Sequence, residues 1–179
     1  MARLIISILF LASLSLNAQQ YIAKDGEITF FSEAPLENIS AINKQVSAVY
    51  DNDSKEIVFQ LYIKDFIFPK ALMQEHFNEN YMESDIYPNA SFKGRIKNWG
   101  KIDLTEASQE VTIDGTMEIH GVSKEISEKG RISLSKGNVI GYSNFQIMVA
   151  DYDIEIPRLV RENIAKIINV DIELVLKKK

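Results

Sequence analysis

The segment FPKALMQEHFNENYMESDIYPNASF, residues 68–92, differs from the rest of the chain because it carries the one clear helical pattern. Met73, Phe77 and Tyr81 recur at four-residue spacing, which places three large apolar side chains on one stripe of a helix. The flanking sequence alternates with the period of strands instead. We therefore predict one helix, over about residues 69–82, that lies against a sheet or across its mouth.

Prolines mark both ends of this predicted helix. Pro69 suits a first helical turn, where the N–H that proline lacks would have no partner within the helix. At the other end, Pro88 disfavours the helical conformation of Tyr87, and Asn89-Ala90-Ser91-Phe92 then starts an extended segment. The helix is expected to be a single insertion between two strands.

Outward from this helix, apolar and polar residues alternate in about eight segments joined by turn-forming sequences. The clearest segment runs from Gln109 to His120, with Val111, Ile113 and Met117 on one side and polar residues on the other. One wet face per strand and sequential hairpins favour an all-β, eight-stranded antiparallel barrel over a parallel sheet. A sandwich of two sheets stays open as the alternative.

Three segments are less regular than these strands. Glu56–Phe68 reads as one strand, whereas Leu36–Asn43 is compatible with one helical turn and Pro157–Ala165 with a short helix. We therefore expect the barrel to carry one main helix near its mouth and minor helical turns elsewhere.

The interior of an eight-stranded barrel is either filled by side chains or just wide enough for one small ligand. Apolar stripes belong more often to an ordinary packed core than to a ligand site, and the pattern alone leaves the choice open. A cavity is favoured by the large side chains available to line it, namely Phe30, Phe59, Phe77, Tyr81, Met82, Phe92, Met117 and Phe145.

The first eighteen residues form a different kind of sequence. Arg3 gives a positive start, Leu4–Leu14 forms an apolar core, and Ala18 is a small residue suited to cleavage. The apolar core is too short to span a bilayer, and no basic stop follows it. We therefore predict a secretory signal peptide over residues 1–18, one domain over residues 19–179, and a periplasmic or secreted mature protein.

The composition restricts the chemistry of the chain. None of its 179 residues is a cysteine, which excludes disulfides, thiolate ligands and a lipid attached to an N-terminal cysteine. Removal of Arg3 with the signal peptide changes the formal net charge from −5 to −6. This negative balance argues against nucleic acid or anionic lipid headgroups as bulk partners, although a local basic spot is compatible with it.

Two histidines, His76 and His120, are the candidates for a titrating group or an imidazole ligand near neutral pH. They do not stand at a local ligand spacing, which weakens the case for a metal site with neighbouring carboxylates. Glu75 and Glu79, one turn apart, are more simply a solvated helix face. We predict no catalytic residue, no metal and no enzyme activity, and we expect His120 to hydrogen-bond across the hairpin that Gly121 turns.

Two sequence blocks follow one another in a characteristic order. In the first, the helix with His76 is closed by Tyr87-Pro88 and followed by Ala90-Ser91-Phe92-Lys93-Gly94. The second is the strand VTIDGTMEIHGVSK, residues 111–124. In order and spacing both blocks resemble the YceI-like proteins, whose corresponding strand ends in His-Gly-Val-Thr/Ser-Lys. The resemblance covers about Gly26 to the C-terminus.

This resemblance implies a lipocalin-like barrel, exported in bacteria, that holds a polyisoprenoid or similar long-chain amphiphile as a carrier or sequestering protein. By the same resemblance, His76, Phe77, Tyr81 and Met82 would lie near the barrel mouth, with Phe92 just inside. Each buried methylene contributes about 0.8 kcal/mol, so such a chain needs no strong polar contact. The resemblance implies no cofactor apart from the bound lipid.

The charges expected at the mouth depart from the family pattern. The residues after His76 are neutral or acidic where many members carry a basic residue. Glu75, Glu79, Glu83 and Asp85 are expected to surround the mouth, where they would repel a diphosphate. A neutral lipid, fatty amide or quinone-like tail is therefore the expected ligand.

Two other functions stay open at this point. A rim-site enzyme or metal-dependent protein would use His76 with nearby carboxylates, and His76→Ala would abolish its activity. A ligand-free interaction module would purify without lipid and reveal a protein partner on cross-linking. The leading prediction is a carrier of a hydrophobic ligand that binds no nucleic acid, contacts membranes transiently, and is a monomer or homodimer.

Overall fold

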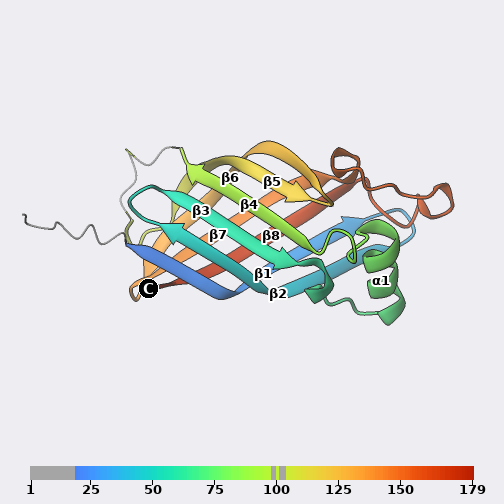
Figure 1. Cartoon of the computed structure of the whole chain (residues 1–179), viewed down its shortest axis with the longest axis horizontal. Coiled ribbons are helices and arrows are strands. Elements are labelled where there is room, and N and C mark those ends of the chain that lie inside the picture. The colour runs from blue at the N-terminus through green and yellow to red at the C-terminus, as the bar shows by residue number, and fades with distance from the viewer. Residues whose placement is uncertain (1–18, 98–99, 101–103) are drawn as a thin grey trace, which may run out of the picture.

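The computed structural model describes residues 19–97, 100 and 104–179, so the predicted signal peptide at residues 1–18 lies outside the described part. Eight antiparallel strands follow one another around a closed barrel, and the last strand pairs with the first (Figure 1). The predicted antiparallel barrel is confirmed, and the two-sheet sandwich is excluded. The strands are β1 (Gln20–Glu33), β2 (Asn38–Asp51), β3 (Glu56–Tyr62), β4 (Asn89–Ile96), β5 (Gln109–Ile119), β6 (Val122–Ser135), β7 (Asn138–Met148) and β8 (Ile167–Lys178).

The alternating pattern builds the barrel wall because alternate side chains of a strand point to opposite faces. In β1, Ile28, Phe30 and Ser32 share the inner face. In β3, Leu61 is 4% exposed on the inner face, whereas Val58 on the outer face is 40% exposed. The apolar side chains of each strand therefore meet inside the barrel.

The predicted helix lies at one end of the barrel, on the right in Figure 1. It consists of an α-helical segment, α1 (Ala71–His76), and a wider π-helical segment, η2 (Phe77–Tyr81). The helix begins two residues later than predicted because Lys70 is still extended, with φ −122° and ψ 129°. Pro69 therefore lies before the first turn and not within it. Among the described residues, no helix is long and apolar enough to cross a membrane.

Two irregular segments differ from their expected structure. Leu36–Asn43 is not a helical turn, because the chain from Asn38 onward belongs to β2 and pairs with β1. Glu56–Phe68 is not a single strand, because β3 ends at Tyr62 and a 3-10 turn, η1 (Ile63–Asp65), follows. The Asn43 side chain donates to the Tyr62 carbonyl at 3.0 Å and satisfies the backbone where the strand stops.

The predicted helix over residues 157–165 is reduced to one 3-10 turn, η5 (Arg158–Val160). This turn lies in the β7–β8 loop, which we define as residues 153–166 and which follows another 3-10 turn, η4 (Val149–Tyr152). Contacts with the β1–β2 region hold the loop. The Leu36 N–H donates to the Glu162 carbonyl at 2.9 Å, and the Ala165 N–H donates to Ser32 Oγ at 2.9 Å.

The core is tightly packed at the barrel end opposite the helix. Tyr50, Val139 and Leu176 are each at most 1% exposed there, and the Tyr21 and Tyr50 ring centroids lie 6.2 Å apart. Burial raises the pKa of Tyr50, and the nearby Tyr21 and Asp51 add to the shift. Side chains therefore fill most of the lumen at this end of the barrel.

Candidate functional site

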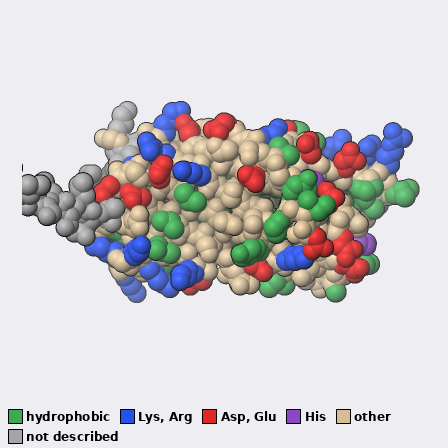
Figure 2. Space-filling view, in the orientation of Figure 1, with side chains coloured by type: hydrophobic (Ala, Val, Ile, Leu, Met, Phe, Trp, Pro, Cys, Tyr) green, Lys and Arg blue, Asp and Glu red, His purple; other side chains and the backbone are tan. Residues whose placement is uncertain are grey.

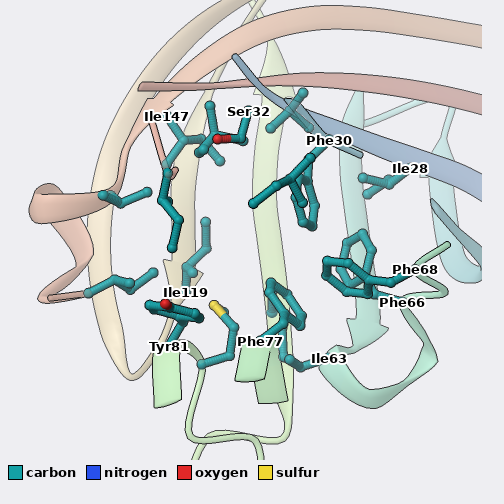
Figure 3. A pocket seen from close by; sticks show the side chains of 18 of the residues that line it. Ile28, Phe30, Ser32, Ile63, Phe66, Phe68, Phe77, Tyr81, Ile119 and Ile147 are labelled. Carbon is teal, nitrogen blue, oxygen red and sulfur yellow. The ribbon is translucent and has the colours of Figure 1, made fainter. Parts of the chain in front are cut away.

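A cavity of about 370 Å³ occupies the helix end of the barrel (Figure 3). Its volume falls within the roughly 300–1,000 Å³ of typical small-molecule sites. The inner faces of the strands form its wall, and the helix covers it with the predicted stripe of Met73, Phe77 and Tyr81. The sequence pattern did not decide between a packed and a hollow interior. In the structure, one half of the lumen is packed and the other half is hollow.

Four phenylalanines attach the helix to the barrel. The Phe77 ring lies 5.5 Å from Phe30, 5.6 Å from Phe66 and 4.9 Å from Phe68, measured between ring centroids. Phe30 also contacts Phe66 and Phe68 at 5.4 and 5.7 Å. All four rings border the cavity, so the same side chains hold the helix in place and shape the site.

The structure brings the predicted ligand-contacting residues together around the lumen. Phe92 is the one predicted residue that does not line the main cavity. It lines a second cavity of about 70 Å³ nearer the packed end. Its ring stacks on Phe59 at 5.3 Å and lies against Gly94 and Gly115, where an added Cβ would overlap it. Contact of these residues with a ligand stays a prediction. The other eight, which all line the larger cavity, are Phe30, Phe59, His76, Phe77, Tyr81, Met82, Met117 and Phe145.

The two cavities share four wall residues, among them Phe59 and Phe145, which form a partition between them. On its outer side the smaller cavity is lined by Glu128 and Ser143, close to Gly130, where the pairing of β6 with β7 begins. Burial raises the pKa of Glu128. The four shared side chains, Phe59, Met117, Phe145 and Ile172, therefore lie between the two cavities.

Sequence reasoning missed two groups of cavity residues. Phe66 and Phe68 follow β3, where the chain crosses the barrel end and is held by backbone hydrogen bonds between Ile42 and Ile67. The β7–β8 loop forms the other side of the mouth. The phenylalanines at positions 66 and 68 were a usable signal, but nothing in the loop sequence indicated its position. The loop residues that line the cavity are Ile154, Ile156, Val160, Asn163 and Ile164.

Polar groups are few around the cavity and lie mostly toward its mouth. Glu37 is the one acidic side chain among the described lining residues, and it pairs with Lys70 at 2.8 Å. No lysine or arginine is present among those described lining residues. Burial raises the pKa of Tyr81, whose ring also borders the cavity (Figure 3). The site is therefore suited to an apolar body with a weakly polar end.

The expected ring of acidic residues around the mouth is not formed as predicted. Glu83 faces the His120 ring, with Oε2 3.0 Å from Nε2, and Asp85 pairs with Lys64 at 2.5 Å. Glu75 and Glu79 are exposed on the helix and do not line the cavity. Two of the four predicted acids are thus paired with cationic or imidazole groups, and the acid that does reach the cavity is Glu37.

His120 connects the two sequence blocks rather than bridging its own hairpin. Its Nδ1 donates to the Tyr152 carbonyl at 3.1 Å, and its ring packs against Tyr87 with centroids 4.5 Å apart. The neighbouring Gly121 has φ +72°, and a Cβ there would approach the Tyr87 ring to 2.6 Å. The expected cross-hairpin bond of His120 was wrong. Within the described residues, no three His, Asp or Glu side chains are grouped to hold a metal ion.

Comparison with known proteins places this geometry in a family. Residues 15–176 match the YceI-like domain. The chain belongs to the YceI-like family. The recognition made from the His76 and His120 blocks is therefore confirmed. No curated protein is similar enough to match this YceI-like chain.

Solved structures share the barrel of this YceI-like protein at low sequence identity. A polyisoprenoid binding domain from Saccharophagus degradans, implicated in plant cell wall breakdown, has 16% identity and a TM-score of 0.77, over 90% of this chain and 99% of that one. BcnA of Burkholderia cenocepacia has 12% identity and a TM-score of 0.71, over 84% and 95%. The YCEI protein of Campylobacter jejuni has 22% identity and a TM-score of 0.61, over 76% and 82%. At these identities the likeness establishes the fold.

Proposed function

We propose that this YceI-like protein is an exported carrier or sequestering protein that holds one polyisoprenoid or similar long-chain amphiphile. The observation that carries the proposal is the apolar cavity of about 370 Å³ at the helix end of the barrel. Family membership and the fold shared with a polyisoprenoid binding domain support it. The signal-like sequence at residues 1–18 supports export to the periplasm or beyond.

The cavity volume sets a scale for the bound chain. An apolar cavity of about 150 Å³ holds one benzene ring, so a cavity of 370 Å³ holds about 15 carbon atoms. This corresponds to about three prenyl units or an acyl chain of similar length. At about 0.8 kcal/mol for each buried methylene, burial of the chain supplies the main part of the affinity.

The polar groups at the mouth favour a ligand with an uncharged head. A diphosphate would need cationic side chains, and the described residues that line the cavity include neither lysine nor arginine. The charge of Glu37 is balanced by Lys70 at 2.8 Å. The other polar side chains among the described residues that line the cavity are Ser32, His76, Tyr81, Ser91 and Asn163. We propose a binding role with no catalytic step for these residues.

The test is native mass spectrometry of the mature protein purified from the compartment to which it is exported, followed by organic extraction of any added mass. We expect one prenyl or acyl species at a ratio near one to one, with about 15 buried carbon atoms. Uptake of an isoprenoid alcohol from detergent micelles by the delipidated protein checks the same site. A protein that carries no lipid and takes up none in either assay would contradict the proposal.

A further inference from the structure

The β7–β8 loop carries the most exposed large apolar side chain on the described surface. Leu159 is 97% exposed in the η5 turn of this loop. Arg158 and Arg161 on either side of it are exposed as well. Within the same loop, Val160 and Asn163 line the main cavity. The loop therefore presents one face to the cavity and projects a leucine between two arginines into solvent.

A second exposed leucine lies on the segment that holds this loop. Leu36, between β1 and β2, is 67% exposed, and its N–H donates to the Glu162 carbonyl at 2.9 Å. Single apolar residues on a surface are ordinary, but here two exposed leucines lie on segments that a hydrogen bond joins, beside loop residues that line an apolar cavity. We call Leu36 and residues 157–161 the leucine rim.

Charge distinguishes the leucine rim from the opposite side of the mouth. Arg158 and Arg161 form no ion pair with any described residue. Residues 157–161 contain no acid, and the exposed Glu155 and Glu162 border them on either side. The helix on the opposite side exposes Glu75 and Glu79 instead. In Figure 2 basic side chains lie at the upper right, where Figure 1 draws the β7–β8 loop, with some acidic side chains beside them, and further acidic side chains lie at the lower right.

We propose that the leucine rim docks the protein on an anionic lipid bilayer. Arginines within a Debye length of such a surface are attracted to its phosphates, and an exposed leucine between them can enter the acyl boundary. The overall negative charge of the chain keeps the remaining surface away from the bilayer. Docking in this orientation brings the mouth of the cavity to the membrane. The inference does not depend on the cavity being loaded.

The experiment is co-sedimentation of the full mature protein with vesicles of phosphatidylglycerol and phosphatidylcholine in equal parts, compared with vesicles of phosphatidylcholine alone. We expect binding to the anionic vesicles only, and its loss in 1 M salt, where the Debye length is about 3 Å. Leu159→Ser should weaken binding about tenfold or more. The double variant Arg158→Gln and Arg161→Gln should weaken binding about 25-fold, at about fivefold for each arginine.

The matched control is Ile86→Ser, which removes an apolar side chain of 66% exposure that directly follows Asp85 and lies three residues after Glu83. This variant should bind the anionic vesicles as the wild type does. Absence of wild-type binding, or equal losses in Ile86→Ser and Leu159→Ser, would overturn the proposal. So would a dimer in sedimentation analysis that Leu159→Ser converts to a monomer, because the rim would then be a contact between copies. Lipid uptake from micelles tests the carrier proposal separately. A protein that takes up lipid but does not bind the vesicles would contradict the docking proposal alone.

Discussion

A larger side chain on the wall of the main cavity should weaken ligand binding without lowering the stability of the fold. Ala90 of β4 lines the main cavity, and its side chain is only a methyl group. Ala90→Phe therefore adds one aromatic ring to the lumen. Gly94, on the same face of β4, is unsuitable because an added Cβ would overlap the Phe92 ring and approach the Asp114 carbonyl to 2.6 Å. The ring at position 90 is expected to occupy about 150 Å³, the space of one benzene molecule.

The magnitude follows from the volume that remains. Loss of about 150 Å³ from a cavity of 370 Å³ displaces about six of 15 carbon atoms. At about 0.8 kcal/mol for each methylene, binding of a 15-carbon chain should weaken by about 5 kcal/mol, or more than three orders of magnitude in Kd. The free energy of unfolding should stay within about 1 kcal/mol of wild type or increase, because the ring fills existing space.

The assay is a titration of the delipidated protein with alcohols of increasing chain length, together with urea denaturation of each variant. Ala107→Phe is the control, since Ala107 is exposed in the loop before β5 and should bind every chain as the wild type does. We expect Ala90→Phe to retain short chains while losing long ones. Unchanged affinity for a 15-carbon chain in a stable Ala90→Phe protein would show that the ligand does not occupy the cavity.

Three further predictions concern stability. Phe77→Ala should lower the free energy of unfolding, measured by urea denaturation, by about 2 kcal/mol or more. This is below the roughly 3–5 kcal/mol of fully buried phenylalanines because Phe77 is half-buried. An effect no larger than that of Leu72→Ala, at the exposed Leu72, would be inconsistent with the ring cluster holding the helix. Burial raises the pKa of Glu128, so its ionised carboxylate destabilises the fold, and Glu128→Gln should be more stable than wild type at pH 7. The difference should vanish below the ordinary pKa of 4.5, where the carboxyl is protonated in both the folded and unfolded states. Equal denaturation midpoints at pH 7 would refute this. Gly121→Ala should cost more than Gly137→Ala, which has a similar positive φ of +79° but open space around it, and thermal melts in which the two variants shift equally would argue against a tight contact at Gly121.

The wall of the barrel could be predicted because strand alternation is a local property. Ile28, Phe30 and Leu61 face inward as their period of two requires. The helix was located by its own spacing, and its start was misplaced because Lys70 remains extended after Pro69. Boundaries failed where distant contacts set them, as at Tyr62, whose carbonyl is satisfied by Asn43.

The candidate site could be predicted in part, because large side chains that point inward near the helix lie in the lumen of a barrel. Phe92 illustrates the limit: its ring lies over Gly94 and Gly115, so it borders the smaller cavity rather than the main one. The β7–β8 loop was not recognised as part of the mouth, because the hydrogen bonds from the Leu36 N–H to Glu162 and from the Ala165 N–H to Ser32 join residues far apart in the chain.

The sequence by itself determined the strand period, the single helix and the two blocks that identify a YceI-like barrel, because each is encoded over a few neighbouring residues. Only the tertiary structure decided that one half of the lumen is packed and the other hollow, and that His120 meets Glu83 and Tyr152 instead of its own hairpin. Whether inward side chains fill a barrel depends on how far apart the opposing walls stand. That distance is set by the closure of all eight strands and by the segments that cross the barrel end.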